Sequence, residues 1–154
     1  MKVRVGLRAS IILSLMLRAT AFFGDAMRSE GGVLGYWERP TKAVLRFYPC
    51  GREVCGMIVR LSPTSGRKTD SRNPDASLRA RPLCGLDIGT GFQQTDANHL
   101  VGGRLYDPVS GKTYSGMATS DGDEVKLRGY VGISWFGKSE VWHRVDPVSL
   151  ESCK

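Results

Sequence analysis

Residues 100–130, LVGGRLYDPVSGKTYSGMATSDGDEVKLRGY, contain three strand-like stretches separated by two short connectors. The stretches are Leu100–Tyr106, Thr113–Ser120 and Glu124–Tyr130, each rich in residues that favour extended backbone. Asp, Pro, Ser and Gly fill the connectors, and these residue types favour tight turns. Neither connector is long enough to hold a crossover helix, so consecutive strands must pair antiparallel. This part of the chain therefore predicts a β-meander.

The tripeptide Gly111-Lys112-Thr113 in the first connector also ends the phosphate-binding motif G-x-x-x-x-G-K-[ST]. The motif needs a leading glycine where this chain has Tyr106. It also needs a helix after the loop, whereas Thr113 begins a strand-like stretch. We therefore interpret the tripeptide as part of a hairpin turn and expect no nucleotide.

Short apolar runs separated by turn residues continue over the rest of the chain. No helical pattern of roughly 10–15 residues separates them, which argues against a parallel α/β fold. We expect an all-β domain, an antiparallel up-and-down β-barrel of about eight to nine strands, because closure removes exposed sheet edges. A two-sheet sandwich is the alternative. The other expected strands are Leu34–Glu38, Ala43–Tyr48, Cys55–Leu61, Leu86–Gln93, Val131–Trp135 and Glu140–Val145.

The first and last strands of a closed barrel are neighbours. Trp37 lies in the first expected strand, and Trp142 and Arg144 lie in the last. We therefore expect an aromatic ring and a guanidinium group to stack where the barrel closes.

Residues 62–82 are too polar and too rich in proline for a core strand and are expected to form one long loop, with a helical turn at Asp75–Arg79. Three arginines of this loop lie close in sequence to two aspartates. One interpretation is an anion-binding lid; the other is a loop held in place by Arg–Asp pairs. We favour the second, because a long ordered loop needs such ties.

Residues 1–26 have the layout of a secretory signal peptide. A basic beginning precedes the apolar run Ala9–Leu17, and small residues follow up to Ala26, the expected cleavage site, although Arg18 interrupts the pattern. The run is shorter than the roughly 20 apolar residues of a spanning helix. Residues 27–154 would then form a single domain, located in the periplasm or outside the cell.

The chain has four cysteines, and an exported protein meets an oxidising compartment in which disulfides form. Cys50 and Cys55 flank a plausible tight turn, so we expect them to pair. For Cys84 and Cys153, pairing and free thiols both remain open.

Charge and motifs exclude several function classes. The formal charge of +7 falls to +4 without residues 1–26, and the remaining basic residues are spread rather than clustered, so we expect no nucleic acid partner. Cys50 and Cys55 could also form half of a zinc site, but no second cysteine pair or histidine pair supplies the other ligands, and His99 and His143 are the only histidines, so no metal site is expected. Cys84 is the best candidate nucleophile, but a disulfide-bonded or buried thiol is the simpler interpretation. We predict no catalytic residues and no cofactor.

The motifs of the chain resemble an exported bacterial family catalogued as domain of unknown function 2147. The resemblance covers nearly all of the chain after the signal peptide and implies a lipocalin-like β-barrel without established chemistry. Two departures are Arg18 and the pair Trp135-Phe136. The matching residues are Gly35-x-Trp37, Cys50 to Gly56 with Ile58-Val59, Asp70-x-x-Asn73-Pro74-Asp75, Leu78-Arg79-x-Arg81-Pro82-Leu83-x-Gly85, Gly102-Gly103-x-Leu105-Tyr106-Asp107-Pro108-x-x-Gly111-Lys112-x-Tyr114, Leu127-Arg128-Gly129-Tyr130-Val131-Gly132 and Trp142-x-Arg144-Val145.

A small barrel with an apolar interior holds at most one small ligand. The leading hypothesis is therefore a protein that binds a small hydrophobic or anionic amphipathic molecule. The alternatives are a filled barrel that binds an envelope protein or polymer, and an envelope enzyme. The candidate ligand-binding residues are four aromatic residues at the interior or mouth (Trp37, Tyr106, Tyr130 and Trp142) and three arginines for a polar head group (Arg79, Arg81 and Arg128).

Overall fold

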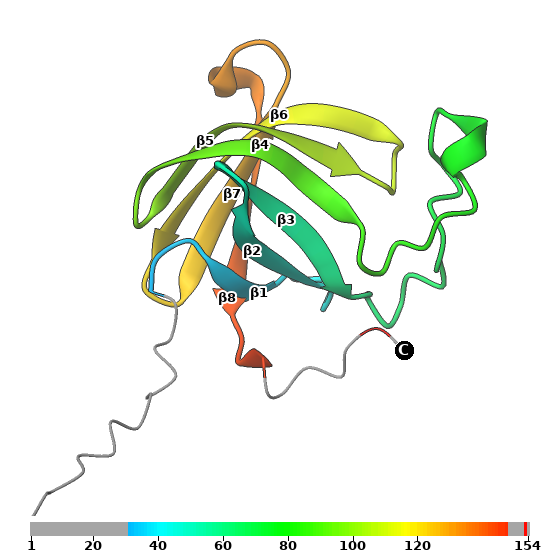
Figure 1. Ribbon diagram of the computed structural model, residues 1–154, viewed down its shortest axis with the longest axis horizontal. Helices are drawn as coiled ribbons and strands as arrows, with labels where there is room; N and C mark the ends of the chain where they lie inside the picture. Colours follow the sequence, from blue (N-terminus) through cyan, green and yellow to red (C-terminus); the bar gives the residue numbers. More distant parts are fainter. Residues whose placement is uncertain (1–30, 148–152, 154) are drawn as a thin grey trace, which may run out of the picture.

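The computed structural model describes residues 31–147 and Cys153; the expected signal peptide and its cleavage site at Ala26 lie outside the described residues. Eight strands form a closed antiparallel barrel, in which each strand pairs with the next and β8 pairs with β1 (Figure 1). The elements are β1 (Gly35–Glu38), β2 (Val44–Cys50), β3 (Glu53–Arg60), the 3₁₀-helix η1 (Ala76–Leu78), β4 (Asp87–Asp96), β5 (His99–Asp107), β6 (Lys112–Asp121), β7 (Glu124–Tyr130), the 3₁₀-helix η2 (Ser134–Phe136) and β8 (Lys138–Arg144).

The closed barrel confirms the predicted fold class and excludes the sandwich. Eight of the nine expected strands are present, each with ends within three residues of the prediction. The expected strand Val131–Trp135 is wrong, because this segment forms a bend followed by η2. The carbonyl oxygens of Ser134 and Trp135 accept hydrogen bonds from the Arg128 side chain, and this contact holds the backbone in a loop.

The chain segment before β1 closes one end of the barrel. The Val33 amide donates to the carbonyl of Ala97 (2.8 Å), and the Trp37 indole donates to the carbonyl of Val33 (2.9 Å). Arg144 places its guanidinium carbon 4.1 Å from the centre of the Trp37 ring and donates to the carbonyl of Leu34. The predicted stacking of an aromatic ring and a guanidinium where the barrel closes is therefore confirmed.

Aromatic side chains fill the middle of the barrel. Phe47 stacks on Trp142 with 6.2 Å between ring centres and meets Phe92 edge-on at 6.0 Å. Phe92 fits because the neighbouring strands carry Gly103 and Gly116, where a Cβ atom would collide with its ring or crowd it. Close packing of this kind leaves no room for a ligand in the middle of the barrel.

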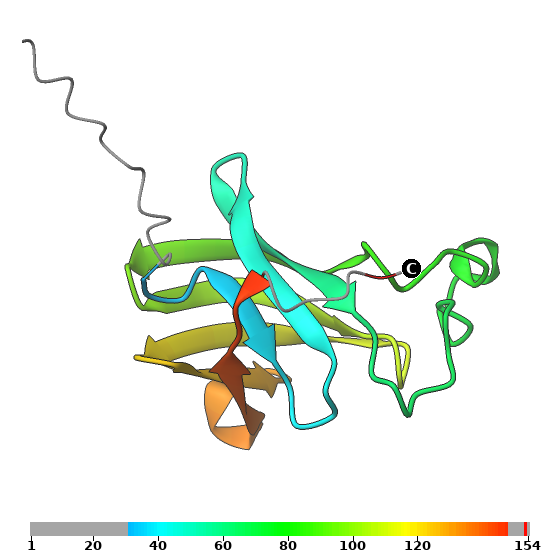
Figure 2. The same cartoon turned by 90° about the horizontal axis from the view of Figure 1, so that it is seen from below.

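Strand direction sorts the connections into two groups. Because the strands alternate in direction, the short turns 51–52, 97–98 and 122–123 lie at the closed end. The connections 39–43, 61–86, 108–111 and 131–137 lie at the opposite, open end. In Figure 2, the connections 39–43 and 131–137 project from the same edge of the barrel.

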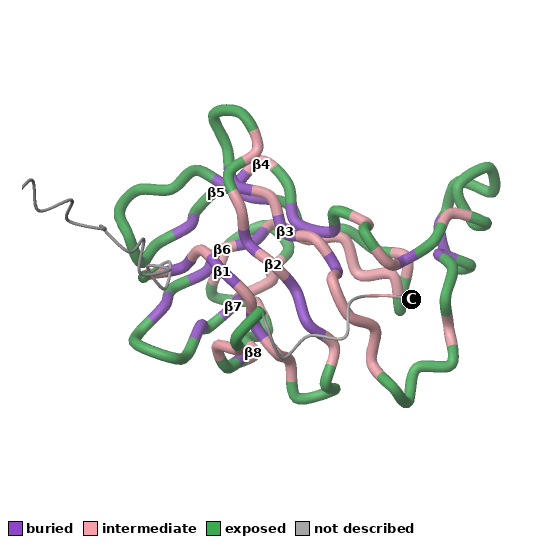
Figure 3. Tube along the Cα trace, turned by 60° about the horizontal axis from the view of Figure 1, so that its bottom comes forward, coloured by how far each residue is buried: buried purple, intermediate pink, exposed green. Residues whose placement is uncertain are grey.

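The segment 61–86 is the expected long loop, and η1 occupies the expected helical turn. The loop folds back on itself at the bridge between Thr69 and Pro82. It is mostly exposed (Figure 3). Within it, Asp70 and Asn73 are buried. The Arg81 side chain donates to the Asp70 carboxylate at 2.9 Å, which confirms the interpretation of a loop held by an Arg–Asp pair.

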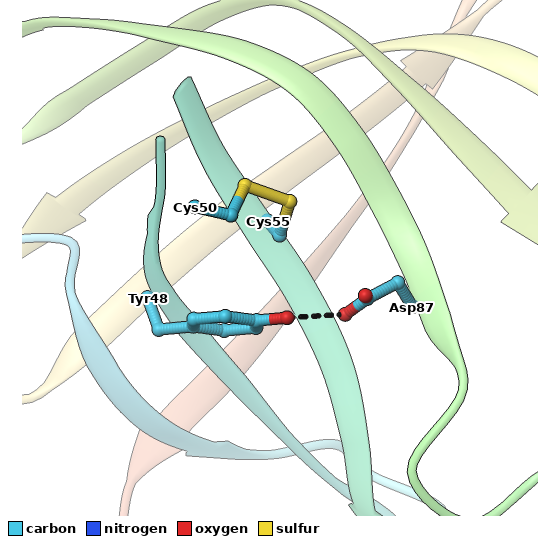
Figure 4. The surroundings of a disulfide bond; sticks show 4 residues. All are labelled: Tyr48, Cys50, Cys55 and Asp87. Carbon is cyan, nitrogen blue, oxygen red and sulfur yellow. Dashed lines mark hydrogen bonds between the residues drawn. A yellow bond between two sulfur atoms is a disulfide. The ribbon is translucent and has the colours of Figure 1, made fainter. Parts of the chain in front are cut away.

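Two disulfides are present. Cys50–Cys55 bridges β2 and β3 as predicted, beside a hydrogen bond of 2.9 Å from the Tyr48 hydroxyl to Asp87 (Figure 4). Cys84–Cys153 joins the end of the long loop to the C-terminal region, across 69 residues of sequence. Between residues 31 and 147, no helix is both long and apolar enough to cross a membrane.

Candidate ligand-binding cleft

The open end of the barrel holds a cleft of about 580 Å³. This volume lies inside the range of roughly 300–1,000 Å³ that is typical of small-molecule sites. The cleft therefore provides the space that the filled middle of the barrel lacks. Its lining residues are Arg39, Ile88, Leu105, Tyr106, Asp107, Pro108, Tyr114, Leu127, Gly129, Tyr130, Val131, Phe136, Lys138, Ser139, Glu140 and Trp142.

The floor of the cleft is apolar. Ile88, Leu127 and Trp142 are all buried, and they come from β4, β7 and β8. Trp142 also forms the boundary with the filled middle, because Phe47 stacks on its ring. An apolar group that enters the cleft would therefore rest on side chains that are already fixed by core packing.

A polar cluster occupies one side of the cleft. The Glu140 carboxylate oxygen Oε2 accepts hydrogen bonds from Nε1 of Trp142 (2.7 Å) and Nε of Arg39 (2.9 Å), and it lies 2.7 Å from Arg39 Nη2. The Arg39 guanidinium also lies over the Trp142 ring, 5.5 Å from its centre. These contacts hold an ion pair and the Trp142 indole together at one side of the cleft.

Tyr106 joins the cleft wall to the long loop. Its hydroxyl donates to Asp70 Oδ1 at 2.6 Å, while Asn73 donates to Asp70 Oδ2 at 2.7 Å. The Arg81 guanidinium lies 5.7 Å from the centre of the Tyr106 ring. Both Asp70 and the Tyr106 ring are thus held from several sides, which makes this wall of the cleft rigid.

The electrostatics of this pair follow from its surroundings. Burial by itself raises the pKa of Asp70, but hydrogen bonds from Tyr106, Asn73 and Arg81 outweigh it, so the pKa lies below its ordinary value. Burial, together with the bond to Asp70, raises the pKa of Tyr106. At neutral pH, Asp70 is therefore an anion and Tyr106 a neutral donor.

Of the seven candidate ligand-binding residues, three line the cleft and four do not. Tyr106, Tyr130 and Trp142 line the cleft. Trp37 is buried at the closed end, under Arg144. The three arginines serve the protein's own backbone and loops. Arg79 donates to the carbonyl of Asn73, Arg81 binds Asp70, and Arg128 binds the carbonyls of Ser134 and Trp135.

Sequence reasoning missed the polar cluster and much of the lining. Leu127 had a detectable signal, because Val125 and Leu127 alternate with polar residues along β7. No local signal pairs Arg39 with Glu140, because 101 residues separate them. Their contact depends on β8 lying beside β1, which only barrel closure brings about.

Cys84 was the best candidate nucleophile of the chain, and the disulfide with Cys153 occupies its thiol. A disulfide sulfur is not a thiolate and cannot begin nucleophilic catalysis. Among the residues between 31 and 147, together with Cys153, no cluster of three or more metal-binding side chains occurs.

Comparison with known proteins places the chain in a family. The family described as "Uncharacterized protein conserved in bacteria (DUF2147)" matches residues 35–144. No curated protein matches the sequence. Among solved structures, protein HP1028 from Helicobacter pylori, described as belonging to the lipocalin family, is similar with a TM-score of 0.70 and 18% identity, over 77% of this chain and 86% of that one. The chain therefore belongs to the DUF2147 family of bacterial proteins and has a lipocalin-like fold.

Proposed function

We propose that this protein binds one small, mainly apolar molecule in the cleft at the open end of the barrel. The observation that carries the proposal is the cleft itself, about 580 Å³ with a buried apolar floor. Tyr106, Tyr114 and Tyr130 add aromatic walls with polar edges. Such a combination of apolar area and a few polar groups is characteristic of small-molecule sites.

The lining also indicates the chemical class of the ligand. Two basic residues, Arg39 and Lys138, face two acidic ones, Asp107 and Glu140, so the cleft has balanced charge. The three arginines expected to meet an anionic head group are engaged elsewhere. The best fit is an amphipathic molecule with an apolar body and one neutral or zwitterionic group that bonds to Arg39 and Glu140.

The proposed site of action is outside the cytoplasm, in the periplasm or the medium. Two disulfides support this, because such bonds persist in oxidising compartments and are rare in reducing ones. The signal-peptide pattern of residues 1–26 points the same way.

A substitution that fills the cleft tests the proposal. At Gly129, which lines the cleft, a Cβ atom would make only ordinary contacts, the nearest being 3.7 Å from the Tyr114 Cβ. Gly129→Val adds this Cβ atom and two methyl groups to the lining of the cleft. We expect it to weaken binding of the fluorescent apolar probe N-phenyl-1-naphthylamine by about tenfold or more, since the added volume displaces bound ligand.

The matched control is Thr119→Val, on the exposed outer face of β6, which should bind the probe as the unaltered protein does. Native mass spectrometry after gentle extraction will show whether the protein carries a ligand from the cell. If the probe does not bind, or binds Gly129→Val equally well, the cleft is not the binding site.

A further inference from the structure

The loop 131–137, between β7 and β8, is the most apolar exposed part of the described chain. Val131, Ile133, Trp135 and Phe136 are 69%, 61%, 87% and 81% exposed. The loop has no charged residue, and Figure 1 shows it projecting from the barrel at the top of the view. Large apolar side chains gathered in this way on a protein surface mark an interaction site.

Part of the backbone of this loop is already paired within the protein. Arg128 donates from Nε to the carbonyl of Ser134 (2.7 Å) and from Nη2 to that of Trp135 (3.2 Å). The Phe136 amide donates to the carbonyl of Ile133 at 3.2 Å. A third Arg128 nitrogen, Nη1, donates to the Ser139 hydroxyl, which fixes the start of β8. Polar backbone groups that are paired within the protein lower the cost of entering a medium without water.

The open end of the barrel, which carries the loop, has an excess of basic residues, most of them in the loop 61–86, and such an excess is complementary to an anionic surface. The four connections at the open end carry seven basic residues and two acidic ones, whereas the three turns at the closed end carry one of each. Lys138 directly follows the loop, and Arg39 lies with Phe136 on the rim of the cleft. The seven basic residues are Arg39, Lys42, Arg67, Lys68, Arg72, Arg79 and Arg81, and the two acidic ones are Asp70 and Asp75.

We propose that the loop 131–137 inserts into the surface of an anionic phospholipid bilayer and docks the open end of the barrel there. Tryptophan and phenylalanine favour the interface between lipid head groups and acyl chains, and nearby basic residues favour anionic lipids. The shape of the site argues for a bilayer over a protein partner. A stable protein interface takes about 20–30 residues from each side, far more than one projecting loop of seven residues offers.

Docking would also place the cleft at the membrane surface. Val131 and Phe136 belong to the loop and line the cleft as well. An apolar molecule that leaves the bilayer beside the loop would therefore meet Val131 and Phe136 where the loop joins the cleft. The docking itself depends only on the loop and the charges, and it does not rest on the proposed ligand binding.

The tryptophans of the chain make the test direct. The chain has three, and Trp37 and Trp142 are 0% and 2% exposed, so a change in emission on membrane binding reports on Trp135. The mature protein, isolated from the cell that produces it, is mixed with vesicles of phosphatidylcholine and phosphatidylglycerol. We expect a blue shift of the emission and quenching by lipids with brominated acyl chains. Both should weaken at high salt, which screens the basic residues.

Substitutions then locate the contact. Trp135→Ser combined with Phe136→Ser should reduce the fraction of protein that sediments with anionic vesicles by about tenfold or more, because two large apolar side chains are lost. Val141→Ser is the matched control, since Val141 is an apolar residue 40% exposed on β8. It should bind vesicles as the unaltered protein does.

Three results would overturn the proposal. The first is an absence of blue shift and quenching with anionic vesicles. The second is undiminished vesicle binding by the double variant. The third is a dimer that the double variant loses, found together with an absence of lipid quenching, because the loop would then bind a second copy of the chain. Gly129→Val, which fills the cleft, should still bind vesicles, so failure of ligand binding and failure of docking give different results.

Discussion

A single carboxylate, Asp70, joins the long loop to the wall of the cleft. It is fully buried, and it accepts hydrogen bonds from Tyr106 on β5 and from Asn73 and Arg81 in the loop. Because the Tyr106 ring also lines the cleft, the position of the loop and the shape of the cleft depend on the same ionised group.

Asp70→Asn keeps the size of this side chain and removes its charge. Loss of one partner from a buried ion pair is costly, but Arg81 is 33% exposed and partly solvated. We expect the free energy of unfolding in urea at neutral pH to fall by about 2 kcal/mol. Asp121→Asn, at the exposed end of β6, should leave it within about 0.5 kcal/mol.

The same variant, Asp70→Asn, tests how the free energy of unfolding depends on pH. The pKa of Asp70 is lower in the folded protein than its ordinary value of 3.8. Its ionisation therefore stabilises the fold fully above that value, and the effect is lost as the pH falls through the lower folded pKa. The difference in unfolding free energy between the unaltered protein and Asp70→Asn should shrink as the pH falls below 3.8. A constant difference would mean that the charge is not the source of the stability.

Gly111, in the connector between β5 and β6, is a second residue that lies close against the long loop. Its φ angle is +73°, and a Cβ atom there would collide with the carbonyl oxygen of Arg72 in the long loop. Gly111→Ala should therefore lower the free energy of unfolding by about 1–3 kcal/mol. Lys112→Met, at the neighbouring exposed position, should change it by less than about 0.5 kcal/mol. Equal effects would contradict the assignment of this stretch as a plain hairpin turn.

At the scale of the elements, the seam between β1 and β8 has the shortest ladder of the barrel. It contains two register pairs, Trp37 with Arg144 and Glu38 with His143, whereas β6 and β7 share seven. Side chains compensate for the short ladder. Arg144 covers the Trp37 ring and binds the carbonyls of Gly32 and Leu34, so one guanidinium holds β8, β1 and the segment before β1 together.

Arg144→Met should open this seam. The substitution keeps an apolar side chain over Trp37 but removes the cation and its hydrogen bonds. We expect a loss of about 2–4 kcal/mol in unfolding free energy and faster hydrogen exchange, first in the amides of β1 and β8. Arg104→Met, at an exposed position of β5, is the control. Uniformly faster exchange over all strands would show that the seam has no special role.

At the scale of the whole molecule, the barrel is divided into a filled part and a cleft. The closed end and the middle are occupied by Trp37, Phe92, Phe47 and Trp142, and the cleft lies above Trp142 at the open end. The two disulfides act at different ranges. Cys50–Cys55 closes a turn of one hairpin, and Cys84–Cys153 ties the C-terminal region to the long loop.

The two disulfides should differ in their effect on stability. In the chain-entropy description, a bridge stabilises more when it closes a longer segment, and the separations here are 69 and 5 residues. Replacing both Cys84 and Cys153 by serine should cost about 4 kcal/mol, against about 2 kcal/mol for Cys50 and Cys55. Urea unfolding of the two double variants measures this difference. A larger loss for the Cys50–Cys55 pair would contradict the chain-entropy description.

Features that depend on nearby residues could be predicted from the sequence. Residues that favour extended backbone placed Glu124–Tyr130 as a strand, and turn residues placed the connector at Gly111. The pair Cys50–Cys55 was predictable, because only four residues, with turn formers among them, separate the two cysteines. The wrong prediction at Val131–Trp135 also came from a local signal. Apolar residues normally indicate a strand, but here they point to solvent.

The sequence by itself determined the all-β character and the order of the strands, because backbone preferences and side-chain alternation act between neighbouring residues. Closure into a barrel rather than a sandwich depends on the pairing of β1 with β8, which the tertiary structure decided. Only the tertiary structure decided which residues meet at the open end. Arg39 reaches Glu140, Tyr106 reaches Asp70, and Arg128 turns outward to hold the loop 131–137. These contacts join residues that are distant in sequence or depend on which face of a strand a side chain takes. They follow from register and barrel closure, which the whole chain sets together.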